Sequence, residues 1–356
     1  MKLDKFLNQR WLMGLLGVMF LIVVTSCDDD EPAPPAMPDD IVTIAQGNSD
    51  LTSLVAALTK FPDLVNTLSG AGTFTVFAPT NAAFDALLSV IGQTSIDDVP
   101  EDVLKDILEY HVIATAALQS TDLSDGQTAG TVNGADVTVT INNGVFINQA
   151  QVTTADVEAS NGFVHIVDAV LVPQDILDIV GTIVAPAYFN KDFSTLIAAV
   201  NAADEDILSV LLGNGPSGNG LTLFAPNNAA FEAAGITALP DAATLSAVLK
   251  YHVLDATVGS GDLPSGSAAI ASLNGDFYLS NVAAGVFING GTQVTATDIT
   301  GSNGVVHLID KTLLPPSQNI AEIVSASAAA DPAEFTLLLA AFQAAGFADV
   351  AAVGRT

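Results

Sequence analysis

Apolar residues recur at the spacing of an amphipathic helix in four segments of the chain. Residues 50–58 and 192–200 each place leucine, isoleucine or valine one helical turn apart. Residues 101–110 gather their apolar side chains on one face, and a segment that starts at Asp241 repeats this pattern. We therefore predict helices over these four segments.

Residues 74–77 form a short apolar run that is typical of a buried strand. Ala78 and Pro79 end this run, because proline lacks the N–H that a strand ladder needs. Thr80 or Asn81 then offers an N-cap for a further helix.

The later part of the first unit carries the alternating pattern of strands. Val137, Val139 and Ile141 alternate with polar residues, and an apolar run returns after Asn142-Asn143-Gly144. Asparagine and glycine tolerate the left-handed backbone of a tight hairpin turn. Residues 163–167 predict a last strand that ends at Asp168. Helices thus precede strands without the alternation of a parallel sheet, which predicts the α+β class.

The chain repeats itself at long range. Residues 50–58 recur at 192–200 and again at 334–342, each step being 142 residues. Later landmarks recur in the same order: FTVFAPTNAAF (74–84) as LTLFAPNNAAF (221–231), EYHVI (109–113) as KYHVL (250–254), GVFIN (144–148) at 285–289, and SNGFVHIVDAVLVP (160–173) as SNGVVHLIDKTLLP (302–315).

These repeats divide the chain into five parts. We expect a signal peptide at 1–26, an acidic Pro-rich tether at 27–40, complete domains at 41–175 and 176–318, and the truncated start of a third domain at 319–356. The third copy has helical spacing but no partner strands in the chain. It either packs on the second domain or belongs to a longer array, and we favour the longer array.

The N-terminal segment has the pattern of an exported protein. Lys2, Lys5 and Arg10 precede an apolar run over residues 11–24, which is short for a membrane span. The run ends in Val-Thr-Ser before Cys27, which resembles the lipobox of bacterial lipoproteins, in which the cysteine is acylated. An ordinary secretory signal or a buried cysteine is the alternative. We favour lipidation at Cys27.

Residues 27–40 hold six acids and four prolines among fourteen residues, so we expect an extended tether. At ~3.1 Å per residue it would reach roughly 40 Å from a lipid surface. The acidic run 28–31 resembles a signal that carries some lipoproteins to the outer face of the outer membrane; a solvated linker is the alternative. We expect a lipid-anchored, surface-exposed protein of the cell envelope.

Charge and cysteine content exclude two classes of protein. The chain carries 39 acidic and 9 basic residues, a formal net charge of −30. Nucleic-acid binding depends on Lys and Arg that neutralise phosphates, so it is excluded. A single cysteine excludes an internal disulfide scaffold.

Two recurring segments resemble the hallmarks of the fasciclin (FAS1) domain. Phe-Ala-Pro-[Thr/Asn]-Asn-x-Ala-Phe occurs within 74–84 and 221–231, and Asn-Gly-x-[Val/Ile]-His-x-[Ile/Val]-Asp within 160–173 and 302–315. The resemblance covers both repeats, about four fifths of the chain. It implies tandem domains, each a wedge of antiparallel strands with helices packed around it, and an extracellular, adhesive role.

The motif residues are expected to be structural. His165 and His307 lie in apolar runs, so we predict buried imidazoles bonded to a carboxylate or to the backbone. The structural motif residues are Pro79, Asn81, His165 and Asp168, and in the second copy Pro226, Asn228, His307 and Asp310.

The resemblance also implies candidate ligand contacts. In animal fasciclin domains, a Tyr-His segment and an Asp-Ile pair have been associated with integrin binding. The matching positions are Tyr110, His111, Asp156 and Val157, and in the second copy Tyr251, His252, Asp298 and Ile299. Val157 departs from the Asp-Ile pattern, and Tyr110 lies at a helix end before apolar residues, which favours the core.

Catalytic and metal-binding patterns are missing from the sequence. There is no Gly-x-Ser-x-Gly turn, no phosphate-binding loop and no His-Glu-x-x-His motif. We expect neither an enzyme nor a bound cofactor or dedicated metal, and at most weak binding of divalent cations to dispersed carboxylates.

Two functions remain open. The first is a surface-anchored adhesion module that binds a polysaccharide or protein of the extracellular matrix or cell envelope. The second is a periplasmic or envelope scaffold lipoprotein that acts as a spacer or accessory subunit of a larger assembly.

Overall fold

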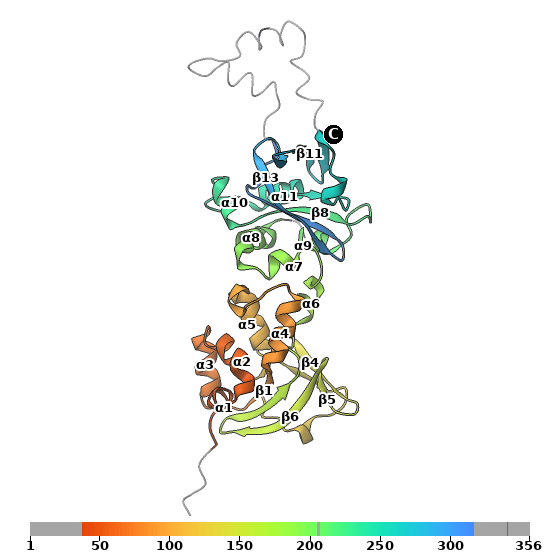
Figure 1. Cartoon of the computed structure of the whole chain (residues 1–356). Coiled ribbons are helices and arrows are strands. Elements are labelled where there is room, and N and C mark those ends of the chain that lie inside the picture. Colours follow the sequence, from red (N-terminus) through yellow and green to blue (C-terminus); the bar gives the residue numbers. More distant parts are fainter. Residues whose placement is uncertain (1–37, 205–206, 317–339, 341–356) are drawn as a thin grey trace, which may run out of the picture. The chain divides into compact units, whose positions relative to one another are not determined.

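The computed structural model describes residues 38–204, 207–316 and 340. The predicted signal peptide, nearly all of the tether with Cys27, and the third copy at 319–356 lie outside the described residues, apart from residue 340. Each of the two complete repeats consists of helices packed beside a sheet of seven strands (Figure 1). The predicted α+β class and tandem arrangement are confirmed.

In the first repeat the helices are α1 (Ile41–Gly47), α2 (Thr52–Leu58), α3 (Pro62–Ser69), α4 (Asn81–Val90) and α5 (Glu101–Tyr110). The strands are β1 (Phe74–Pro79), β2 (Val112–Ile113), β3 (Thr128–Gly130), β4 (Asp136–Ile141), β5 (Val145–Ile147), β6 (Ala150–Ala159) and β7 (Gly162–Val167).

The segment α6 (Gln174–Ile179) precedes the second repeat, whose helices are α7 (Ala185–Tyr188), α8 (Ser194–Ala202), α9 (Ile207–Leu212), α10 (Asn228–Ala233) and α11 (Ala242–Tyr251). Its strands are β8 (Leu221–Pro226), β9 (Val253–Leu254), β10 (Gly266–Ser272), β11 (Gly275–Val282), β12 (Gly285–Ile288), β13 (Thr292–Gly301) and β14 (Gly304–Ile309).

The predicted wedge of antiparallel strands needs one correction. The order in the first sheet is β2-β1-β7-β6-β5-β4-β3, and β1 pairs with β7 in parallel, Phe74 opposite Gly162 and Pro79 opposite Val167. The second sheet repeats this with β8 and β14. The remaining pairs in both sheets are antiparallel. Each sheet is therefore built around a parallel pair made of the first and last strands of its repeat.

The first strand of each pair, β1 or β8, is an interior strand of its sheet and is buried along its whole length. All six residues of β1 are buried, as are all six of β8, so helices and sheet cover both of their faces. A strand buried on both sides reads as a continuous apolar run rather than as an alternation. The run at 74–77 was predicted as a buried strand, and this prediction is confirmed.

Two local predictions are confirmed at residue level. Helix α5 covers the predicted residues 101–110 and buries Val103, Leu104, Ile107 and Leu108. The hairpin between β4 and β5 turns at Asn143, with φ 55°, and Gly144, with φ 152°. Apolar periodicity and turn chemistry are local signals, and tertiary packing reinforces both here.

The two candidates for the cap of α4 have different tasks. Thr80 is the N-cap, and its hydroxyl accepts a hydrogen bond from the N–H of Ala83 at 3.3 Å. Asn81 reaches a different part of the chain: its side-chain oxygen accepts from the N–H of Ser53 at 2.8 Å, and its amide donates to the Ser49 carbonyl at 2.9 Å. Asn81 therefore fastens α4 to the start of α2.

Asn228 makes the equivalent link in the second repeat. It accepts from the N–H of Thr195 at 2.9 Å and donates to the Lys191 carbonyl at 3.1 Å. Pro79 and Pro226 are the last residues of β1 and β8, where the missing N–H helps to end the strand before the helix.

A buried asparagine ties the helices to the start of the last strand. Asn161 accepts a hydrogen bond from the N–H of Ile41 at 3.2 Å and donates to the carbonyls of Leu68 and Gly70 at 2.7 and 2.8 Å. The next residue, Gly162, has φ 154°, and a Cβ there would lie 2.0 Å from the carbonyl oxygen of Phe74. Only glycine therefore fits beside this asparagine.

The second repeat contains the same tie. Asn303 bonds to the N–H of Ile183 at 2.9 Å and to the carbonyls of Leu211 and Gly213, both at 2.7 Å, and Gly304 follows with φ 153°. In each repeat, one side chain thus satisfies three backbone groups that come from two separate segments.

Among the residues that the structure describes, no helix has the length and hydrophobicity needed to cross a lipid bilayer.

We predict that Asn161→Ala lowers the free energy of unfolding of the first repeat by ~3 kcal/mol, because buried backbone groups lose their partners. Chemical denaturation of the full chain, followed by circular dichroism, measures this loss. The control is Asn66→Ala on α3, where the side chain is exposed and the change should stay below about 0.5 kcal/mol. Equal effects of the two substitutions would contradict the assigned role of Asn161.

Candidate binding surface

The tyrosine of each Tyr-His pair is part of the core. Tyr110 is 4% exposed; its hydroxyl donates to the Asp136 carbonyl at 2.8 Å and accepts from the amide of Asn148 at 2.9 Å. Asn148 can reach this position because it adopts a left-handed backbone with φ 53°. The second repeat repeats both contacts, Tyr251 to Asp276 at 3.0 Å and Asn289 to Tyr251 at 3.2 Å.

The histidine of each pair is buried too. His111 is 2% exposed, its Nδ1–H donates to the Ile107 carbonyl at 2.7 Å, and its Nε2 accepts from the N–H of Leu171 at 2.9 Å. A carbonyl only accepts and an amide only donates, so the ring is the neutral Nδ1–H tautomer. His252 makes the same two bonds, to Val248 at 2.7 Å and from Leu313 at 2.8 Å.

These positions correct the expectation that Tyr110, His111, Tyr251 and His252 contact a ligand. Each side chain lies inside its domain with its polar atoms bonded to neighbouring groups. The pairs join the end of α5 or α11 to the strands and to the segment that follows the last strand. In the described structure these side chains link parts of their own domain and are not exposed to a ligand.

Burial also changes the protonation of these two histidines. Desolvation lowers the pKa of His111 from an ordinary 6.5 to about 4, and it lowers the pKa of His252 to about 4 as well. Both rings are therefore neutral at neutral pH.

The other two histidines are fully buried in the last strands and bond to the backbone. Nε2–H of His165 donates to the Leu118 carbonyl at 2.9 Å, and its Nδ1 accepts from the N–H of Asp156 at 3.2 Å. His307 bonds in the same way to Val258 at 2.9 Å and Asp298 at 3.3 Å. These bonds select the Nε2–H tautomer, opposite to that of His111 and His252.

The carboxylates after these histidines hold a different strand. Asp168 accepts from the N–H of Gln151 at 2.7 Å, and Asp310 accepts from the N–H of Gln293 at 2.7 Å. Of the two kinds of partner expected for His165, the structure has the backbone and not the carboxylate.

Asp156 and Asp298 form an exposed acidic corner in each repeat. Both are non-glycine residues with a left-handed backbone, φ 58° and φ 63°, at an irregularity in the pairing of β6 with β7 and of β13 with β14. The carboxylate of Asp156 accepts from the N–H of Ser120 at 2.6 Å and from its hydroxyl, and Asp298 holds Ser260 in the same way, with its N–H at 2.7 Å.

These hydrogen bonds fix the ionisation of the corner. The Ser120 hydroxyl lowers the pKa of Asp156 below its usual value, and the Ser260 hydroxyl does so for Asp298. Each corner therefore presents a carboxylate that is charged at neutral pH. Ser120 or Ser260 orients this carboxylate, and a buried histidine accepts from the backbone N–H of the same aspartate.

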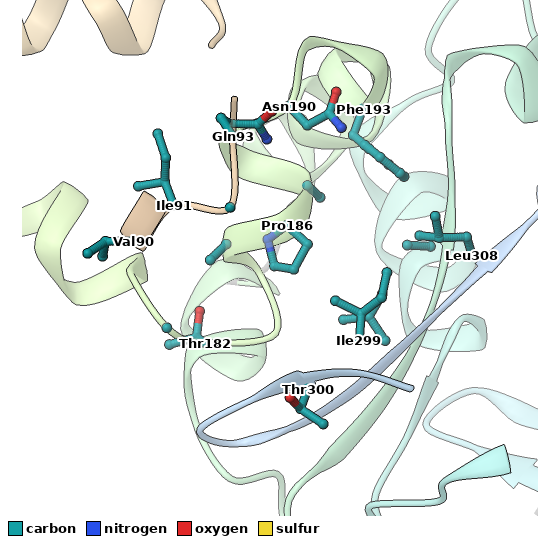
Figure 2. Close-up of a pocket in the computed structure, with 16 residues that line it drawn as sticks. Val90, Ile91, Gln93, Thr182, Pro186, Asn190, Phe193, Ile299, Thr300 and Leu308 are labelled. Atoms are coloured by element: carbon teal, nitrogen blue, oxygen red, sulfur yellow. The ribbon is translucent and has the colours of Figure 1, made fainter. Parts of the chain in front are cut away.

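The residues after these aspartates are half-buried. Val157 lies opposite Val164 of β7, and Ile299 lies opposite Val306 of β14. Ile299 also lines an apolar hollow with Pro186 and Leu308 (Figure 2). Of the eight ligand-contact candidates, the structure thus leaves Asp156 and Asp298 exposed and Val157 and Ile299 partly exposed.

Metal binding has no site among the described residues, where no group of three His, Cys, Asp or Glu side chains is placed to hold an ion. The four histidines use both ring nitrogens for backbone bonds.

Several structural residues escaped the sequence reasoning. The buried Thr75 donates to the Ala116 carbonyl and accepts from the N–H of Leu118, both at 2.8 Å, so it holds the segment that leads to the acidic corner. The others missed are Asn148, Asn161 and Ser120, with Thr222, Asn289, Asn303 and Ser260 in the second copy. The same residue type occupies the matching position of the second repeat in each case. Comparison of the two repeats could therefore have identified these residues.

We predict that stability falls as the pH is lowered from 6.5 towards 4. The unfolded chain takes up protons on His111 and His252 near pH 6.5, whereas the folded chain does so near pH 4. The free energy of unfolding should therefore decrease by about 1.4 kcal/mol per pH unit for each histidine in this window. Urea unfolding at several pH values measures this slope.

The matched variant is His111→Gln, which removes one titrating group and should reduce the slope of the first repeat, while carboxylate effects stay the same. A wild-type slope that is unchanged in this variant would contradict a buried neutral His111.

Comparison with known proteins gives a consistent result. The fasciclin domain model matches residues 49–173 and 191–315. Protein sll1483 of Synechocystis is 41% identical over 134 residues, which are 37% of this chain and 73% of that protein. Human periostin is 31% identical over 297 residues, which are 76% of this chain and 34% of periostin.

The cell surface glycolipoprotein MPB83 of Mycobacterium bovis is 42% identical over 142 residues, which are 38% of this chain and 61% of that protein. This chain therefore spans only part of periostin and of MPB83. The chain is also similar to the structure of a FAS1 domain pair from the insect cell adhesion molecule Fasciclin I. The alignment covers 76% of this chain and 98% of that chain, with 20% sequence identity and a TM-score of 0.31. Because the domain model matches most of both repeats, the resemblance is confirmed and the chain belongs to the fasciclin domain family.

Proposed function

We propose that this protein is a lipid-anchored adhesion protein of the bacterial cell surface, without catalytic activity, that binds a polysaccharide or protein of the matrix or envelope. The observation that carries the proposal is the use of the buried polar side chains. The four histidines, Tyr110, Tyr251 and the two tie asparagines bond mainly to the backbone of their own domains, so none is available as a nucleophile, base or ligand.

A binding function is then left to the surface. The exposed acidic corner is the part of the original ligand-contact pattern that remains accessible, and both repeats carry it with the same left-handed aspartate and the same serine. A left-handed backbone at a non-glycine residue costs energy, and both repeats carry this cost at the same aspartate. A rigid carboxylate suits a partner that donates hydrogen bonds, such as sugar hydroxyls or a basic protein segment.

The cell-surface location is supported by relatives and by the N-terminus. MPB83 is named as a cell surface glycolipoprotein. Cys27 follows the predicted signal peptide, and the acidic tether would hold the domains away from the lipid. Divalent cations would add only weak, dispersed bridging between carboxylates. A periplasmic spacer or accessory subunit is the second candidate, and its domains would be sheltered from protease added to intact cells.

We predict that Cys27→Ala releases the protein from membranes or leaves its signal peptide uncleaved, because the acylated thiol is the anchor. Metabolic labelling with a radioactive fatty acid, followed by fractionation, should give label on the wild type alone. Equal labelling of the two proteins would exclude lipidation at Cys27.

We predict that the double variant Asp156→Asn, Asp298→Asn reduces attachment to an immobilised matrix partner at least fivefold. Asparagine tolerates the left-handed backbone, so the unfolding free energy should change by less than about 1 kcal/mol at these exposed sites. Attachment is measured with the purified chain on surfaces coated with matrix polysaccharide or protein.

The matched control is Asp85→Asn, Asp192→Asn, which removes the same charge from one exposed site in each repeat. If the control loses as much attachment as the corner variant, general charge rather than the corner accounts for binding. If neither variant loses attachment, the corner is not the contact surface.

A further inference from the structure

The second repeat ends its sheet on an unusually open strand. The order β10-β11-β12-β13-β14-β8-β9 places β10 at an edge, and β10 runs for seven residues, Gly266–Ser272. The equivalent edge strand of the first repeat, β3, has three residues. An edge strand presents unpaired N–H and C=O groups, so its length sets how much backbone is available for pairing.

Strand β10 lacks the features by which proteins usually protect such an edge. Its sequence GSAAIAS contains no charge and no proline, and its seven residues pair with β11 without a register shift. By contrast, the carboxylate of Asp125 at the edge beside β3 accepts from the N–H of Ile141 at 2.8 Å and so places a charge there. A backbone hydrogen bond toward β9 begins just after β10, where Leu273 donates to the Val253 carbonyl at 2.8 Å.

The side chains of β10 alternate in a way that fixes the geometry of any pairing. Ala268 and Ile270 face the core and are partly buried, whereas Ser267, Ala269 and Ala271 are exposed. Residues that lie opposite one another in an antiparallel pair point to the same face of the sheet. A symmetric pair of β10 strands must therefore match exposed residues with exposed residues.

We propose that β10 pairs antiparallel with β10 of a second copy of this chain, joining two seven-stranded sheets through a two-fold axis at Ala269. In this register Ala269 lies opposite Ala269 of the second copy. The flanking pairs are Ser267 with Ala271, Ala268 with Ile270, and Gly266 with Ser272. A two-fold axis is the commonest symmetry of protein pairs.

Charge repulsion opposes a second copy less at this edge than elsewhere on the chain. The chain has a net charge of −30, so most of its surface repels another copy, yet no charged residue lies in β10. The nearest carboxylate on the adjacent strand, Asp276, pairs with Ala271 of β10. In the proposed register Ala271 faces Ser267 of the second copy, and Ser267 pairs with Ser280, so Asp276 aligns with a serine and not with another carboxylate.

An exposed aromatic residue flanks the same position. Tyr278 of β11 is 66% exposed and pairs directly with Ala269. The proposed register therefore forms one row across four strands, with a tyrosine at each end and two alanines between them. Each ring can cover the small neighbouring side chains, and such cross-strand contacts stabilise a sheet.

Sedimentation equilibrium of the full chain at 0.15 M salt or above tests this proposal. The measurement contains no ligand, so its outcome is independent of the proposed adhesive function. We expect a concentration-dependent dimer. Ala269→Lys places two like charges opposite each other and should raise the dissociation constant at least tenfold, and Ala269→Glu should do the same.

An equimolar mixture of the two variants should restore the dimer, since lysine then faces glutamate. This rescue separates pairing at Ala269 from a folding defect, and Ala269 is exposed, so both variants should fold. The control Thr128→Lys on β3 should leave the dimer unchanged. A chain that stays monomeric at high concentration, or a dimer that is insensitive to Ala269→Lys, would overturn the proposal.

Discussion

Each repeat depends on the parallel pairing of its first and last strands. Strands β1 and β7, or β8 and β14, are interior strands of the sheet although most of the domain lies between them in sequence. Closing so long a loop costs entropy, so this pairing must be favoured by specific contacts. Asn161 and Asn303 supply them at the start of the last strand, where each bonds to three backbone groups, and the following glycine allows the close approach to the first strand.

The histidines extend the same principle to the other end of the strands. His111 links Ile107 of α5 to Leu171 after β7 as the Nδ1–H tautomer, and His165 links Leu118 to Asp156 of β6 as the Nε2–H tautomer. His165 also accepts from the backbone N–H of Asp156, whose exposed carboxylate is held by Ser120. The scaffold thereby accounts for the polar residues that first suggested chemistry, and it delivers a rigid acidic corner to the surface.

Local features of this fold could be predicted from the sequence, and long-range ones could not. The bounds of α5 and the Asn143–Gly144 turn follow from periodicity and turn chemistry. The parallel direction of β1 and β7 could not be predicted, because a buried apolar run such as 74–77 does not show in which direction its partner strand runs. The family resemblance is confirmed, but the ligand contact that it implied at Tyr110 and His111 does not fit their burial, whereas Asp156 is exposed and has a left-handed backbone. The repeat was the best guide to the missed residues, since both copies keep the same buried polar groups.

Long-range proton–nitrogen NMR of the four histidine rings at neutral pH tests whether these side chains hold the scaffold. It separates the two neutral tautomers and reveals rings that exchange between them. We expect Nδ1–H for His111 and His252 and Nε2–H for His165 and His307, each as a single state, because backbone donors and acceptors fix both nitrogens. Rings that average between tautomers, or the same tautomer at all four positions, would contradict the claim that these side chains hold the scaffold and leave binding to the surface.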